Sequence, residues 1–189
     1  MSRRAESAHR GVVAYTLSRF PKISETFILE ELDAVERRQF RIELLPLRRE
    51  RTASIHPKAE PWLARAHFFP LFSFTTIRSH IVVFARSPRA YVGTFLAVVR
   101  GNWPSRRLLL GALAAWPRAV PMAMQLERDG IGHIHCHFAT HPALAGYIVH
   151  RLAGITFSFT AHGPTPRSAG PCTSSTSSTT IRRRATTTS

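Results

Sequence analysis

Acidic residues, lysine and cysteine are scarce in this chain of 189 residues. It has 11 acidic residues against 26 basic ones, and only two of the basic residues are lysine. The net charge of +15 favours a polyanionic partner such as nucleic acid, anionic lipid or a phosphorylated ligand, but does not choose among them. A GC-rich coding sequence would also favour arginine over lysine. Residues 61–126 hold eight arginines and no acid, so they predict a basic surface.

The two cysteines, Cys136 and Cys172, lie in unlike settings, one in an expected buried strand and one in a polar tail. We therefore expect no disulfide and a reducing cytoplasm. Residues 1–10 are basic, but a short strand-like run follows them instead of the apolar stretch of a signal peptide. The longest apolar window, 108–126, is interrupted by Arg118 and two prolines, which makes it a poor membrane-spanning helix.

The motifs of several enzyme classes are also missing. The chain has no G-x-G-x-x-G or Walker loop, no Ser/His/Asp set and no paired-carboxylate pattern. Its composition is globular up to residue 162, which is enough for one domain. Residues 163–189 contain no acid, no aromatic residue and one large aliphatic residue, Ile181. Such a segment buries too little apolar surface to offset its ordering entropy, and we expect a disordered tail.

The globular part shows apolar runs of strand length separated by helical patterns. The first strand is expected at 12–17, where the run is continuously apolar, and a loop and a helix follow it. Ser24 would cap this helix, with Glu25 in its first turn. The expected buried face consists of Phe27, Ile28, Leu32 and Val35. The expected solvent face consists of Glu31, Glu36, Arg37 and Arg38.

The later segments continue the alternation. Further strands are expected at 42–47, 133–138 and 156–161. Helices are expected at 76–86, 89–100, 106–128 (kinked by its prolines) and 142–152. Strands separated by helices of this length predict parallel crossovers. The fold class is therefore α/β, with a Rossmann-like, doubly wound parallel sheet.

Ligand sites in such sheets lie at the carboxyl ends of the strands. Three segments are brought to that edge: the loop 18–27, the turn 138–141 and His162. Arg19 and Lys22, beside the amides of a helix N-terminus, suit a phosphate or carboxylate, although they are equally compatible with solvated loop charges. His162 would orient a hydroxyl or stabilise a charge, or would be a surface histidine without a role.

Alternation along the strand places His133, His135 and His137 on one face. Neighbours on the same face of a strand are about 6.5 to 7 Å apart, too far for all three to share a tetrahedral ion. We therefore expect no metal here, and histidines that are packed or hydrogen-bonded at the strand end. Trp62, Trp103 and Trp116 lie among the basic helices, where they would serve as interfacial anchors or as core residues.

Three segments together carry a resemblance: Leu17–Ile28, His135–Ala139 and Phe157–Gly163. In order, spacing and strand-end placement, residues 11–163 resemble the N-terminal domain of retaining GT-B glycosyltransferases. They are most similar to the group 1, or family 4, enzymes of colanic acid and exopolysaccharide biosynthesis. The resemblance implies two Rossmann-like domains that face a cleft, one on the acceptor side and one holding a nucleotide-sugar. It also implies transfer of a sugar, with retention, to a lipid-linked saccharide at the inner membrane.

The resemblance also assigns residues. His162 would be the catalytic residue, near the transferred sugar. The residues on the acceptor side would be Arg19, Phe20, Ser24, Glu25, His137 and Thr140. No cofactor and no metal are expected in this chain, and the nucleotide-sugar donor belongs to the full-length enzyme.

The sequence departs from the family after His162. Family members continue with an acidic residue and a donor-binding domain, whereas this chain continues with Gly163-Pro164-Thr165-Pro166 and then low complexity. Out-of-frame translation of GC-rich DNA gives such a composition. Our hypothesis is a frameshift that leaves an acceptor domain at 1–162, a tail at 163–189 and no complete catalytic site.

The basic helices within 61–126 would then face an anionic membrane, so that the protein is cytoplasmic and peripheral to the inner membrane. The alternative function is a non-catalytic basic binding module for a membrane surface, nucleic acid or a separately encoded donor domain. Nucleic acid is disfavoured, because no groove-reading motif or stacking platform is visible.

Overall fold

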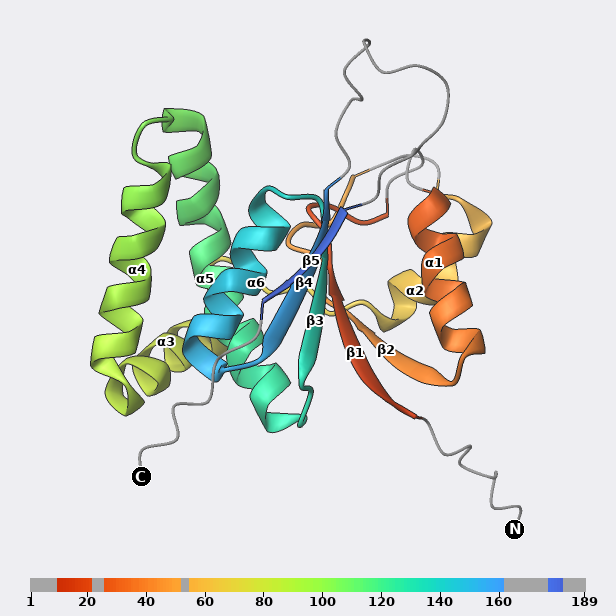
Figure 1. Cartoon of the computed structure of the whole chain (residues 1–189), viewed down its shortest axis with the longest axis horizontal. Helices are drawn as coiled ribbons and strands as arrows, with labels where there is room; N and C mark the ends of the chain where they lie inside the picture. The colour runs from red at the N-terminus through yellow and green to blue at the C-terminus, as the bar shows by residue number, and fades with distance from the viewer. Residues whose placement is uncertain (1–9, 22–25, 52–54, 162–176, 182–189) are drawn as a thin grey trace.

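The protein is a sheet between two layers of helices (Figure 1). Its computed structural model describes residues 10–21, 26–51, 55–161 and 177–181. The sheet has the strand order β2-β1-β3-β4-β5. Its strands are β1 (Gly11–Thr16), β2 (Phe40–Leu44), β3 (His133–His137), β4 (Thr156–Ala161) and β5 (Ser177–Ile181). The first four run parallel, which confirms the α/β doubly wound class.

One face of the sheet is covered by α1 (Thr26–Arg37), the 3₁₀ turn η2 (Pro57–Ala59) and α2 (Glu60–Arg65). The helix α1 buries Ile28, Leu29 and Leu32 against the strands, whereas Phe27 is 40% exposed. The buried face of α1 therefore differs slightly from the predicted one, because Leu29 is buried where Phe27 was expected. For Trp62 of α2, the sequence allowed either an interfacial anchor or a core residue. The structure buries it, and its indole nitrogen donates a hydrogen bond to Asp33 at 3.0 Å.

The other face is covered by α3 (Phe74–Arg86), α4 (Pro88–Asn102), α5 (Arg106–Arg128) and α6 (His141–Ala153). The side chains of Ser73 and Ser105 cap α3 and α5 by accepting from backbone amides. Gly154 ends α6 in the left-handed conformation that glycine tolerates best. All four expected helices are present, and α5 continues through Pro117 and Pro121.

Ser177–Ile181 lies in the segment for which a disordered tail was expected, and it forms β5, antiparallel to β4. The remainder of 163–189 lies outside the described residues. Without β5, the strand β4 would be an edge whose unpaired amides and carbonyls recruit another strand, and β-branched threonine and isoleucine fit a strand. The hydrophobic pattern alone did not predict this element.

Glycine lets α6 pack directly on the sheet. A Cβ atom at Gly146 would lie 2.5 Å from Cys136 Sγ and 3.1 Å from the Phe157 ring. Cys136 is fully buried, and its burial holds the pKa of the thiol well above its usual value, so this cysteine is a packing residue.

We therefore expect Gly146→Ala to lower the free energy of unfolding by about 1 to 3 kcal/mol through overpacking. The matched control is Gly93→Ala in α4, where an added Cβ meets nothing within 4 Å. That change should stabilise the protein by about 0.5 to 1 kcal/mol, because alanine is the better helix former. Urea denaturation measures both; equal stabilities would contradict the close packing.

Candidate functional site

The candidate site lies at the carboxyl edge of the sheet, where β1 ends between β2 and β3. The chain leaves β1 for α1 on one face, and it leaves β3 for α6 on the other. A doubly wound sheet has its crevice where successive connections go to opposite faces, and ligands bind there. In this structure the crevice has a basic cleft on the side of α5 and α6. On the side of α1, histidine and glutamate side chains cluster.

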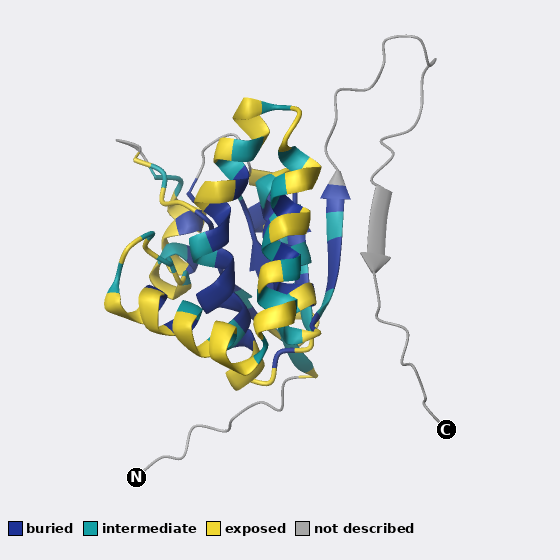
Figure 2. Ribbon diagram, turned by 90° about the vertical axis from the view of Figure 1, so that its left-hand side faces the viewer, coloured by how far each residue is buried: buried dark blue, intermediate teal, exposed yellow. Residues whose placement is uncertain are grey.

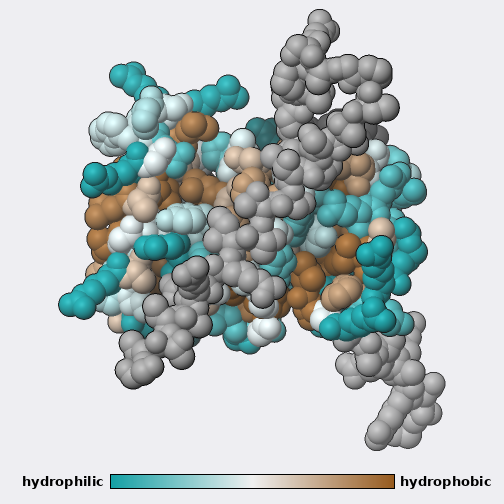
Figure 3. Space-filling view, viewed as in Figure 1, coloured by the Kyte–Doolittle hydropathy of each residue, from teal (hydrophilic) through white to brown (hydrophobic). Residues whose placement is uncertain are grey.

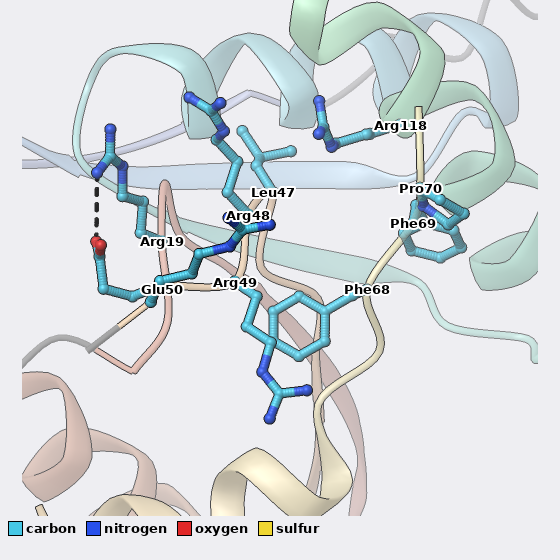
Figure 4. A pocket seen from close by; sticks show the side chains of 10 residues that line it. Arg19, Leu47, Arg48, Arg49, Glu50, Phe68, Phe69, Pro70 and Arg118 are labelled. Carbon is cyan, nitrogen blue, oxygen red and sulfur yellow. Dashed lines mark hydrogen bonds and ion pairs between the residues drawn. The ribbon is translucent and has the colours of Figure 1, made fainter. Parts of the chain in front are cut away.

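The basic cleft is built from the segments that follow β1 and β2 together with the middle of α5 (Figure 4). It encloses about 680 Å³, and a smaller cavity of about 180 Å³ shares four of its lining residues and reaches α6. Its charged lining residues are Arg19, Arg48, Arg49, Arg51, Arg118 and Glu50. Among the described lining residues, five arginines thus face one carboxylate, which is a strong imbalance for a concave surface.

Glu50, the one acid in the described lining of the cleft, does not neutralise it. Glu50 pairs with Arg19 at 3.4 Å, and 53% of the Arg19 side chain is exposed. Arg118 donates to the carbonyl of Ala114 at 2.7 Å, and burial, followed by repulsion from Arg48, lowers its pKa. Because arginine stays charged at neutral pH, the cleft concentrates positive charge in a partly desolvated place. An anion with several oxygens would relieve that repulsion.

His141, at the N-terminus of α6, lines the smaller cavity that adjoins the cleft. Its ring packs against Gly111 of α5 so closely that a Cβ there would lie 1.7 Å from Nε2. Burial lowers the pKa of His141, and the charges of Arg107 and Arg48 lower it further. The imidazole is therefore neutral at pH 7, and a bound anion would draw a proton onto it.

On the other face of the sheet, Tyr15, Glu31, His135 and His137 form the histidine–glutamate cluster. The Tyr15 hydroxyl donates to Glu31 Oε1 at 3.2 Å, and burial together with Glu31 holds the pKa of Tyr15 well above its usual value. Glu31 Oε1 lies 3.9 Å from His135 Nε2, and Oε2 lies 3.6 Å from His137 Nε2. Glu31 was expected to face solvent; instead its carboxylate turns toward β3, with 39% of the side chain still exposed.

Hydroxyl groups of β4 connect the histidines of β3 into a ladder. Ser158 Oγ lies 2.9 Å from His133 Nε2 and 2.8 Å from His135 Nδ1. Thr160 Oγ1 lies 3.1 Å from His135 Nε2, and His133 Nδ1 lies 2.8 Å from the hydroxyl of Thr156. The register places each hydroxyl beside a histidine, with Ser158 opposite His135. The expectation of hydrogen-bonded histidines on one strand face is confirmed.

The residues expected on the acceptor side do not all meet. Arg19 lines the basic cleft, whereas His137 is fully buried in the cluster on the opposite face. Phe20 is only 5% exposed and packs in the core beneath α1, so its ring does not line the cleft. Thr140 is exposed at the start of α6. Ser24, Glu25 and the catalytic candidate His162 lie outside the described residues.

Three important groups were missed from the sequence. Arg48 directly follows the strand expected at 42–47 and received no role, and Arg118 appeared only as an interruption of the apolar window 108–126. Glu31 had the pattern of a solvated helix position. Only the topology could have indicated these three residues, because each of them lies on, or shortly after, a strand or helix that borders the crevice. Spacing along the chain does not reveal that convergence.

The helices α3, α4 and α5 have extensive exposed faces (Figure 2), and α3, α4 and the first half of α5 carry an apolar helical surface. Figure 3 shows hydrophobic side chains there, interspersed with hydrophilic ones. Its most exposed large side chains are Phe72, Phe74, Ile77, Ile81, Leu96, Trp103 and Leu110. In the described part of the chain no single helix is long and apolar enough to cross a membrane. The pair α3 and α4 passes that test together, with a bend of 114° between them.

Comparison of the sequence with protein-family models, with curated proteins and with solved structures gives no match. The function is therefore inferred from the geometry of the crevice.

The cleft predicts the titration of His141. By NMR, its pKa should lie below the value of about 6.5 for an unperturbed imidazole, because burial and neighbouring arginines oppose its charge. Arg48→Gln should raise that pKa, and so should added phosphate. Arg151→Gln, an exposed change at the far end of α6, serves as control. A His141 pKa at or above 6.5, or one indifferent to Arg48, would contradict this description.

Proposed function

We propose that this chain is the acceptor-side domain of a retaining glycosyltransferase of cell-surface polysaccharide biosynthesis. Its basic cleft binds the phosphate-bearing part of a lipid-linked saccharide, while a nucleotide-sugar supplies the transferred sugar. The observation that carries the proposal is the cluster of five arginines around a cavity at the carboxyl edge of β1 and β2. That edge is where a doubly wound sheet binds its ligands.

A phosphate group would bind in this cleft more favourably than a neutral sugar would. Guanidinium groups form paired, charge-assisted hydrogen bonds with phosphate oxygens. The N-terminal end of α6 adds the positive end of a helix dipole beside His141. Neutral His141 accepts a proton as an anion enters, so the cleft adjusts its charge to its ligand.

The apolar helical surface supports a membrane position for this cleft. The helix α5 contributes Arg118 to the cleft and the exposed Leu108, Leu110 and Leu113 to the apolar surface. Arginines are interspersed with the apolar side chains of α3 and α4, and residues 61–126 carry no acid. Exposed apolar groups with a basic surround are the pattern of a helix that lies in an anionic interface. We propose that the protein docks peripherally on an anionic cytoplasmic leaflet, so that a lipid-linked acceptor reaches the cleft from the bilayer.

The cleft is tested with a short-chain prenyl diphosphate in isothermal titration calorimetry. Arg48→Gln and Arg118→Gln should each weaken binding by about tenfold or more, since a hydrogen bond to a charged group contributes about 1.5 to 3 kcal/mol. Arg151→Gln should bind like the unchanged protein, and the corresponding prenyl alcohol should bind far more weakly. Equal affinities for the diphosphate and the alcohol would contradict the proposal.

Membrane docking is tested by co-sedimentation with vesicles that contain phosphatidylglycerol. The double variant Arg89→Gln/Arg100→Gln removes two exposed charges from α4, and Arg37→Gln/Arg38→Gln removes two at the far side of the sheet. At about 1 kcal/mol per arginine near an anionic surface, the first variant should lose about 30-fold in vesicle affinity and the second almost none.

Equal losses in the two variants would mean that only net charge matters, which contradicts a defined docking face. Binding to duplex DNA with a steep salt dependence, but not to vesicles, would favour the nucleic-acid alternative instead.

A further inference from the structure

The histidine–glutamate cluster is not used by the proposed acceptor site, and it lies on the opposite face of the sheet. Its three possible ligand atoms, one each from Glu31, His135 and His137, lie within 4.8 Å of one another. The His135 and His137 rings are edge to face, with centroids 5.1 Å apart. We propose that these three side chains bind a zinc ion. This inference does not depend on the glycosyltransferase proposal.

The distances suit a tetrahedral ion. Ligand atoms bound to zinc at 2.0 to 2.1 Å are separated from one another by about 3.3 to 3.4 Å. Glu31 Oε1 lies 3.9 Å from His135 Nε2 and Glu31 Oε2 lies 3.6 Å from His137 Nε2. With one ligand atom from each residue, no separation exceeds 4.8 Å, which is at most about 1.5 Å more than the tetrahedral value. Rotation of the partly exposed Glu31 side chain would close the difference. The spacing argument against three neighbours on one strand does not apply, because only two histidines come from β3 and the third ligand comes from α1.

The ligand set selects the metal. Two imidazoles and one carboxylate are the protein ligands of many catalytic zinc sites, with the fourth position open to water or substrate. Magnesium and calcium prefer an all-oxygen set, so the imidazoles disfavour them. The buried His137 anchors the site in the sheet, and the partly exposed Glu31 leaves a path for the ion from solvent.

Hydrogen bonds around the cluster already orient two of the ligands. When His135 carries its proton on Nδ1 and donates it to Ser158 Oγ at 2.8 Å, its Nε2 is unprotonated and accepts from Thr160 Oγ1 at 3.1 Å. A zinc ion would take the place of that hydrogen bond. Tyr15, kept protonated by its raised pKa, donates to the Glu31 carboxylate. Partners of this kind fix the tautomer and the direction of zinc ligands.

The test measures zinc affinity of the tag-free chain by competition with a chromophoric chelator. One zinc per chain should bind, and Glu31→Gln should weaken it by at least about 10- to 100-fold, the loss that outer hydrogen-bond partners alone produce. The matched control is Glu30→Gln, the same chemical change at the adjacent, exposed position of α1. Equal affinities of the two variants would overturn the proposal, as would the absence of zinc binding.

A second measurement needs no variant. X-ray absorption of the zinc-loaded, unchanged protein should show two imidazoles among nitrogen and oxygen ligands only. A sulfur ligand would place the ion at a cysteine and would overturn the assignment. The His135→Gln variant, checked for folding by circular dichroism, should lose one imidazole from the spectrum; an unchanged spectrum would again exclude the cluster.

Discussion

The pairing of β1 with β2 on one side and β3 on the other is the constraint on which the rest depends. It forces the connections after β1 and β3 to opposite faces of the sheet. Side chains of β1 then alternate between two cores, with Ala14 beneath α5 and α6 and Tyr15 beneath α1. The strand β1 therefore lies between the basic cleft and the histidine–glutamate cluster, so that the two groups of side chains do not share residues.

The small number of acidic residues in the chain makes the cleft strongly basic. Exposed pairs elsewhere, such as Arg65 with Glu36 and Arg86 with Glu127, use much of the available carboxylate on the outside of the molecule. Among the described residues that line the basic cleft, Glu50 is the single acid beside five arginines. Since α5 also carries exposed leucines, the same helix links an anion-binding cavity to a surface suited to lipid. The proposed binding of a lipid-linked phosphate follows from that combination.

The sequence predicted the fold well where local pattern and burial agree. The apolar run of β1 and the helical patterns at 76–86, 89–100, 106–128 and 142–152 gave elements close to those observed. The short α2 was missed because Pro61 and a charged neighbourhood obscured its pattern, and β5 was missed because its pairing depends on a distant edge strand. For the candidate site, the sequence indicated an edge of the sheet but not which side chains meet there. Arg19 and the carboxyl edge follow from topology, whereas Glu31 meets His135 across about a hundred positions, a contact that only tertiary packing creates. Phe20, chosen for the site, is a core residue for the same reason.

The central claim, that the crevice binds a phosphate-bearing acceptor on the side of α5 and α6, is tested most directly by mapping amide chemical shifts on addition of a prenyl diphosphate. The account predicts that the largest changes fall on residues 18–19, 47–51, 118 and 141, with little change on α1. Changes centred on α1 and His137, or spread evenly over the arginines of the surface, would contradict it.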